Sequence, residues 1–458
     1  MPNFKKLAKN YEENALAALK VLASKPSVYD ESSIKEGAPY GDGVKQALDT
    51  LARWGKDYGF EVDTCEGRAT EIAFGEGGPL IGIYAHADVV PASGKWDNPP
   101  FSPKVYGEGK EAKIIARGVS DDKGPLIAAL FAIKLLKDNG LINGYRVRLV
   151  AGGDEERGSS CLEYYFNKLK KPHCDYGFTP DADFPLIYAE KGIHHARAIF
   201  NKDLSPIIAM DGGTVSNAVC DRLIVTLPTD KDLEKALKEK GIDADITPLG
   251  PIMMVAFKGK TAHGSRPDLG DNAALKAFAF LGEHYEIDAL SRLYLALNDC
   301  HGKSFGGYSN SKELGESTFN YGVVKYESAK KKLTFTIDYR YGEDAKPEVA
   351  LEAFKKNTGC DLIIDSVSPV LLFDKKTPLV STLMKSYRRM TFRLFDKPIA
   401  IGGGTYAKEA KNCVAYGSAF PGHDGAIHSP NEYLFLNDLY AQIAIYADAI
   451  YSLGKLKK

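Results

Sequence analysis

Hydrophobic positions repeat with two different periods along the first 180 or so residues, and these periods predict alternating helices and strands. Residues 4–23 and 44–58 carry apolar side chains at helical spacing, whereas residues 80–84 are continuously apolar, as in a buried strand. The other elements predicted here are strands at 69–74, 113–117, 145–151 and 174–179 and helices at about 124–138 and 159–170. Strands that alternate with helices indicate an α/β sheet covered on both faces.

The pattern changes after residue 186. Between about 187 and 371, strands predominate over helices, and after 372 the alternation of helix and strand returns. The strands expected in the middle stretch are 186–200, 219–226, 251–258, 319–325 and 331–340, and its helices are 231–240, 271–285 and 346–357. The last stretch should hold a helix at 378–392, strands at 398–402 and 412–416, and a helix at 437–453. We therefore predict an α/β domain, 1–186 and 372–458, that is split by an inserted α+β domain, 187–371.

Composition and charge narrow the classes of protein that fit. The chain has 458 residues, a net charge of -1 and 44% hydrophobic residues, which suits a globular protein of two or three domains. The near-zero charge argues against binding nucleic acid or an anionic membrane, and no stretch approaches the ~20 apolar residues of a membrane span. The N-terminus is charged throughout, unlike a signal peptide. The seven cysteines are scattered and form no CxxC pair, so a reducing, cytoplasmic location is expected.

Acidic and histidine residues follow several of the predicted strands. His86 and Asp88 end the strand at 80–85, and residues two apart on a strand point to the same side. The other candidates are Asp121 and Asp122 before the helix at 124, Glu155 and Glu156, Asp181 and Asp183, and His428 with His423 and Glu432 nearby. Each has a purely structural alternative. A histidine at a strand end can be satisfied by local hydrogen bonds, acidic residues favour helix N-termini, and adjacent glutamates favour a solvated loop.

These structural alternatives explain the residues less well when all of them are placed on one sheet. Ligands of an α/β sheet bind at the carboxyl ends of its strands. The residues expected to project there are His86, Asp88, Asp121, Glu155, Glu156 and Asp181. Two histidines and three or four carboxylates suit a pair of zinc-like ions. Such a pair makes a bound water nucleophilic, and one carboxylate that binds no metal can take the proton of that water.

Eight motifs, in order along nearly the whole chain, then carry a family resemblance: HADVVPA, W-x-x-x-P-F, RGVSDDKG, GGDEERGSS, TPDADFP, KGKTAHGSRPDLGDNA, DYRY and HSPNE. With them the chain resembles the dinuclear zinc metallopeptidases of aminoacylase, carboxypeptidase G and carnosinase type. Within that family it is most similar to the bacterial dipeptidase V group, the Xaa-His dipeptidases. The resemblance implies a zinc-peptidase-like α/β catalytic domain, a mixed sheet flanked by helices, with an inserted α+β lid domain.

The resemblance also implies roles at the strand ends. Asp88 would orient His86, and Glu155 would be the general base. The implied metal ligands are His86, Asp121, Glu156, Asp181 and His428, with Asp121 as the bridge between the two ions. TPDADFP offers both Asp181 and Asp183, and Asp181 is preferred because it follows the strand most closely.

The inserted domain contributes candidates of its own. By resemblance, His263 would stabilise the tetrahedral oxyanion from across the cleft, and Asn217 and Arg340 would bind substrate. Arg340 could grip a C-terminal carboxylate through two hydrogen bonds, or it could be an edge-strand arginine in solvent. The glycines 402–404, Gly404 in particular, could hold a carboxylate on their N–H groups or form a tight turn.

The expected function is hydrolysis of short unblocked dipeptides, with two divalent ions per chain, zinc or else manganese or cobalt. One alternative is a deacylase of the same family, acting on N-acyl amino acids or succinyl-diaminopimelate-type substrates, and another is a non-catalytic binder of small molecules or peptides. The insert is longer than the roughly 110 residues implied for many dimeric relatives, and that length favours a monomer in which the lid covers the site of its own chain.

Overall fold

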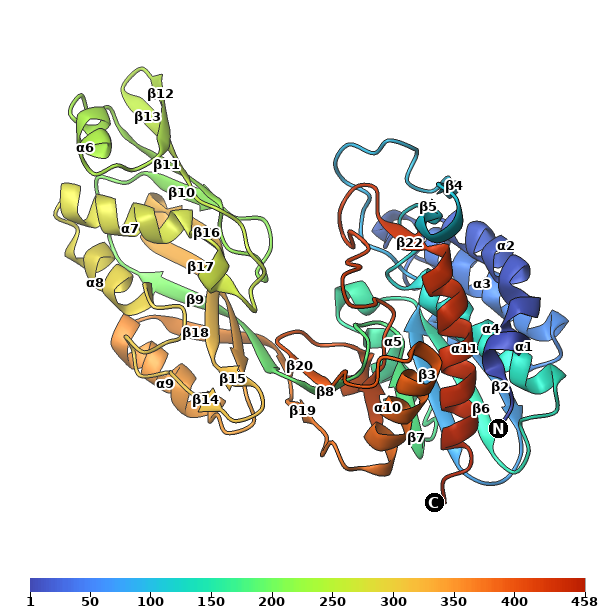
Figure 1. Ribbon diagram of the computed structural model, residues 1–458. Coiled ribbons are helices and arrows are strands. Elements are labelled where there is room, and N and C mark those ends of the chain that lie inside the picture. Colours follow the sequence, from blue (N-terminus) through green and yellow to red (C-terminus); the bar gives the residue numbers. More distant parts are fainter. Residues whose placement is uncertain (458) are drawn as a thin grey trace. The chain divides into compact units, whose positions relative to one another are not determined.

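A computed structural model describes residues 1–457 and divides the chain into two compact units (Figure 1). The first unit consists of Met1–Tyr188, Phe373–Ile399 and the described chain from Thr405 onward. The second consists of Ala189–Leu372 and the short segment Ala400–Gly404. The chain therefore leaves the first unit and returns to it twice.

A mixed sheet forms the centre of the first unit. Six of its nine strands, in spatial order, are β1 (Glu61–Asp63), β2 (Ala69–Gly75), β6 (Arg146–Gly152), β3 (Leu80–His86), β7 (Tyr176–Thr179) and β21 (Cys413–Ala415). Strand β3 runs parallel to both β6 and β7, whereas β1 and β2 are antiparallel additions. All seven residues of β3 are buried, as its unbroken apolar run predicts for a strand covered on both faces.

Helices flank this sheet, which confirms the predicted α/β fold class. They are α1 (Phe4–Ala8), α2 (Glu12–Ala23), α3 (Asp42–Asp57), α4 (Lys123–Asp138), α5 (Ser160–Asn167), α10 (Pro378–Thr391) and α11 (Leu436–Leu453). Helix α4 packs on β3 and β6 and against α11 (Figure 1). The single helix predicted at 4–23 is interrupted by a 3₁₀ turn, Lys9–Tyr11. A small sheet of β4 (Lys104–Tyr106), β5 (Lys113–Ile115) and β22 (Tyr433–Phe435) completes the unit.

The second unit is built on an eight-stranded antiparallel sheet. In spatial order its strands are β12 (Ala244–Leu249), β13 (Ile252–Lys258), β11 (Arg222–Pro228), β10 (Ala209–Gly212), β16 (Thr318–Glu327), β17 (Lys332–Tyr341), β9 (Gly192–Asn201) and β18 (Asp361–Ser368). Its helices are α6 (Leu233–Glu239), α7 (Ala273–His284), α8 (Asp288–Leu297) and α9 (Pro347–Thr358), of which α7 packs on β11 and β13. The pattern did not predict the edge strands β12 and β18, since most of their residues are exposed.

Three short strands lie where the chain passes between the units: β8 (Ile187–Glu190), β19 (Leu371–Leu372) and β20 (Ile399–Ile401). The strand predicted at 186–200 is therefore two strands, β8 and β9, separated by Lys191. A hairpin of β14 (Asn310–Ser311) and β15 (Gly315–Glu316) belongs to the second unit. Within residues 1–457, no helix combines the length and the apolar character that crossing a membrane requires. All seven cysteines of the chain are free thiols.

Candidate metal site

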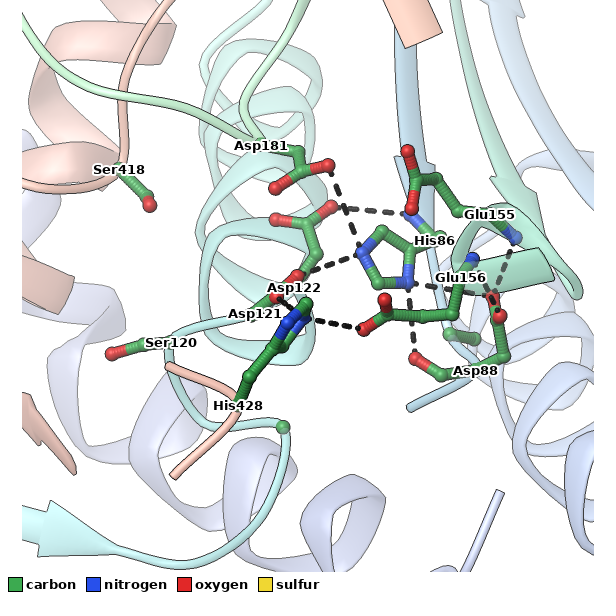
Figure 2. A network of polar contacts seen from close by, with 12 residues as sticks. His86, Asp88, Ser120, Asp121, Asp122, Glu155, Glu156, Asp181, Ser418 and His428 are labelled. Carbon is green, nitrogen blue, oxygen red and sulfur yellow. Dashed lines mark hydrogen bonds and ion pairs between the residues drawn. The ribbon is translucent and has the colours of Figure 1, made fainter. Parts of the chain in front are cut away.

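The parallel strands of the first unit bring three predicted site residues to one edge of the sheet. His86 is the last residue of β3, Glu155 begins a 3₁₀ helix shortly after β6, and Asp181 comes two residues after β7. Because β3 is parallel to both neighbours, the carboxyl ends of all three strands lie at the same edge. Figure 2 shows the three side chains turned toward one another. The structure therefore brings these three residues together at the carboxyl ends of the strands.

His86 is the centre of the group. Its side chain is fully buried, with Nδ1 3.0 Å from the main-chain oxygen of Asp88 and Nε2 2.9 Å from Oδ1 of Asp121. A carbonyl oxygen can only accept a hydrogen bond, so Nδ1 carries the proton that is donated to it. This leaves Nε2 as the nitrogen that faces the carboxylates, which is the orientation a metal-binding histidine needs.

Asp88 contacts both the imidazole of His86 and the loop that carries Glu155 and Glu156. Its carboxylate Oδ1 lies 3.4 Å from Nδ1 of His86, farther than its own main-chain oxygen. The same carboxylate accepts hydrogen bonds from the backbone N–H groups of Glu155 and Glu156, each at 3.2 Å. Asp88 therefore ties the histidine of β3 to the loop that carries both glutamates.

Asp121 lies between two imidazoles. Its Oδ1 is 2.9 Å from Nε2 of His86, and its Oδ2 is 2.9 Å from Nε2 of His428 (Figure 2). His428 also approaches Oε1 of Glu156 at 3.3 Å. One carboxylate with an oxygen directed at each of two histidines is the arrangement that a bridge between two cations requires.

Two groups of side chains are compact enough to hold a cation. One is His86, Asp121 and Glu156, and the other is His86, Glu155 and Asp181; within each, the ligand atoms lie within 4.8 Å of one another. Asp181 is in the second group and its Oδ2 lies 3.8 Å from Nε2 of His86, so the geometry favours Asp181 of the two candidates in TPDADFP. Glu155, in contrast, is close enough to be a ligand as well as a base.

The electrostatics of the site show how crowded its negative charges are. Burial and the neighbouring charge of Asp121 raise the pKa of Asp181 to about 7. Burial and the charge of Asp181 likewise raise the pKa of Glu155 well above its ordinary value. Hydrogen bonds to Asp121 and Glu156 raise the pKa of His428 to about 10. Carboxylates that are buried together repel one another, and a divalent cation is the partner that offsets such repulsion.

Asp122 is the candidate beside Asp121 and the alternative to it as a bridge between the ions. It is fully buried, its Oδ2 accepts a hydrogen bond of 3.1 Å from the backbone N–H of His86, and its Oδ1 has no hydrogen-bond partner among the described residues. Burial and the charge of Asp181 raise its pKa well above the ordinary value. Its position next to Asp121 was the available signal, but the sequence cannot say which of two adjacent carboxylates faces the histidine.

The candidates of the inserted segment gather in the second unit. The backbone N–H of Gly264 donates to the carbonyl of Asn217 at 2.6 Å, which brings Asn217 beside the loop of His263. Arg340 donates from Nη1 to the carbonyl of Gly402 at 2.7 Å, so the glycines 402–404 lie in the same unit.

Arg340 differs from the solvent-exposed arginine that was its alternative. Its side chain is 4% exposed, and its Nε and Nη2 groups donate to the buried carboxylate of Asp338 at 2.9 to 3.1 Å. The Arg340 guanidinium was expected to bind a substrate carboxylate. In the structure, the carboxylate of Asp338 already offsets much of its positive charge. The sequence motif DYRY contains both residues but does not reveal that they pair.

Comparisons with known proteins give matches over most of the chain. Residues 82–452 match the model of peptidase family M20/M25/M40. A Staphylococcus aureus protein that is named as a proposed dipeptidase is 34% identical over 98% of this chain and 99% of its own length.

Solved structures share the fold. The di-peptidase Dug1p from Saccharomyces cerevisiae covers 99% of this chain and 98% of its own, with a TM-score of 0.61 and 14% identity. Human carnosine dipeptidase 1 covers 100% of both chains, with a TM-score of 0.58 and 12% identity.

Proposed function

Since the chain belongs to peptidase family M20/M25/M40 and is a hydrolase, we propose that it is a metal-dependent dipeptidase that hydrolyses short unblocked peptides. The observation that carries the proposal is the position of Asp121 between His86 and His428, with Glu155, Glu156 and Asp181 around them. A protein that only bound small molecules or peptides would have no need for so many buried carboxylates at one place.

We assign the ligands of two divalent ions from this arrangement. His86 and Asp181 would hold one ion, Glu156 and His428 the other, and Asp121 would bridge them. The mixed nitrogen and oxygen donors suit zinc, and manganese or cobalt would also fit a site so rich in carboxylates. When bound, such ions polarise the scissile carbonyl and lower the pKa of the attacking water.

The side chains of the protein would then move the proton. Glu155 accepts the proton of the attacking water at a carboxylate oxygen while the new carbon–oxygen bond forms. It donates the same proton to the leaving nitrogen as the carbon–nitrogen bond breaks. A carboxylate that first takes and then gives this proton acts as general base and then as general acid. Asp88 holds the backbone of Glu155 in place through the 3.2 Å hydrogen bond.

The substrate class can be tested directly. We expect the metal-loaded protein to turn over unblocked dipeptides of the Ala-Ala type faster than their N-acetylated counterparts. Chelation should abolish the activity, and zinc, manganese or cobalt should restore it to different extents. Faster turnover of N-acyl substrates would favour the deacylase, and a metal-loaded protein that cleaves no member of a dipeptide panel would favour a binding protein.

The second unit is proposed as a lid whose polar groups act on the substrate, His263 as the donor to the oxyanion and Asn217, Arg340 and Gly404 as binding groups. We expect His263→Ala to leave the metal content intact and to lower kcat by about 10²–10³-fold, with a smaller rise in KM. Metal analysis and steady-state kinetics on one dipeptide check this. An effect on KM alone would reduce His263 to a substrate-binding residue.

The same variant tests the proposal that the protein is a monomer in which His263 acts within its own chain. Mixing inactive Glu155→Ala protein with inactive His263→Ala protein should restore no activity, and light scattering should give about the mass of one chain, 50.0 kDa. Recovered activity would show that the histidine comes from a neighbouring chain. A cytoplasmic location remains a prediction, in keeping with the free cysteines.

A further inference from the structure

Glu432 is a buried carboxylate that the proposed reaction does not use. It lies directly before β22, four residues after His428, and its side chain is fully buried. Burying a carboxylate is costly unless hydrogen bonds and a counter-charge compensate it. The identity of the groups that compensate Glu432 therefore indicates what it does.

All the recorded partners of this carboxylate lie on the loop that ends at Asp121. Its Oε2 accepts hydrogen bonds from Nη1 of Arg117 at 2.8 Å and from the backbone N–H of Gly118 at 2.9 Å. Its Oε1 accepts from the backbone N–H groups of Ser120 at 2.8 Å and of Asp121 at 3.1 Å. One side chain therefore fixes the backbone of the whole loop, including the main-chain nitrogen of the proposed bridging residue.

The segment that carries Glu432 also carries His428, and its backbone is held in an unfavourable conformation. His428 has a φ of 59° and Asn431 a φ of 61°, in the left-handed region that side chains other than glycine rarely adopt. Such conformations persist only where surrounding contacts impose them. Besides Glu432, a hydrogen bond of 2.6 Å from Oγ of Ser120 to the carbonyl of Tyr433 joins the same two segments.

We propose that Glu432 is a positioning residue that sets the separation of Asp121 and His428 and thereby the affinity of the site for its metal ions. The 2.9 Å contact between Oδ2 of Asp121 and Nε2 of His428 joins residues that are more than 300 positions apart in the sequence. Glu432 accepts hydrogen bonds from the loop of Asp121, and it lies in the same chain segment as His428. This inference rests on the proposed metal site.

The test is a titration of metal-free protein with Co²⁺, followed by visible absorption, for the wild type and for Glu432→Gln. Both carboxylate oxygens of Glu432 accept hydrogen bonds, whereas the side chain of Gln has one oxygen and one NH₂ group. The NH₂ group cannot accept from an N–H donor, so the hydrogen bonds at one of the two positions are lost. We expect the variant to bind at least one ion about 10- to 100-fold more weakly than the wild type, as is usual when a residue behind the ligands is changed. Thermal unfolding of both metal-free proteins, measured in parallel, separates stability from affinity.

Two further variants make the result decisive. Ser120→Ala removes a hydrogen bond between the same two segments but leaves the carboxylate contacts, so its affinity for Co²⁺ should match that of the wild type. If Glu432→Gln does not fold, the double variant Arg117→Met/Glu432→Gln removes both charges of the buried pair, so that Arg117 is not left without its partner. It should show the same loss of affinity.

Superimposable titrations of the wild type and a folded Glu432 variant, with only a lower Tm in the variant, would overturn the inference. Equal loss of affinity in Ser120→Ala would also overturn it, because any weakening of the segment would then suffice. A wild-type protein that binds no Co²⁺ would instead overturn the proposed metal site, and the inference with it.

Discussion

Replacing Glu155 with Gln should remove most of the peptidase activity while the metal ions stay bound. Gln keeps the size of the side chain but cannot take a proton from water, and loss of a general base costs about 10²–10⁴-fold in rate. The backbone of residue 155 would still be held by Asp88, since that contact uses the main-chain N–H. Turnover of one dipeptide, together with elemental analysis of the same sample, measures both effects.

The neighbouring glutamate is the matched control for this experiment. Glu156 contacts His428 at 3.3 Å and is proposed as a ligand, so Glu156→Gln should lower the metal content as well as the activity. Glu155 also lies within reach of His86 and Asp181, and the comparison therefore separates a base from a ligand. If Glu155→Gln kept more than about half of the wild-type turnover, or lost metal as Glu156→Gln does, its role as the base would be refuted.

The second large effect is expected at Asp121. Asp121→Ala should lose both metal ions, and the activity with them, because this carboxylate directs one oxygen toward His86 and the other toward His428. Removing a ligand that serves only one ion should leave the other ion bound. Elemental analysis of the purified variant should therefore give a metal content close to zero per chain.

Asp181→Ala is the comparison for this prediction. Asp181 approaches His86 at 3.8 Å, whereas Asp121 contacts both His86 and His428 at 2.9 Å, so Asp181→Ala should keep more metal than Asp121→Ala. Two ions per chain retained by Asp121→Ala would mean that another group bridges them, with the buried Asp122 as the first candidate. Circular dichroism of each variant establishes that the fold is intact.

The sequence by itself predicted the class of fold, and it named the residues of the candidate site from the strand ends and from the family resemblance. The buried run of β3 and the apolar face of α4 are local signals. Burial of a strand or of a helix face requires apolar residues at regular positions in a short stretch of sequence. The convergence of His86, Glu155 and Asp181 follows from those signals, since parallel strands share the edge at which they end. Exposed elements such as β12 and β18 carry no such pattern, and they were missed.

Only the tertiary structure decided the contacts between distant segments. It shows Asp121 between two histidines and Glu432 holding the loop that ends at Asp121. It also pairs Arg340 with Asp338 and with the carbonyl of Gly402. Gly402 lies in the short segment Ala400–Gly404, which belongs to the second unit although the chain on either side of it belongs to the first. Such contacts depend on how strands and loops far apart in the chain pack, and no local periodicity records that packing. The residues were visible in the sequence, but the partners that fix their chemistry were not.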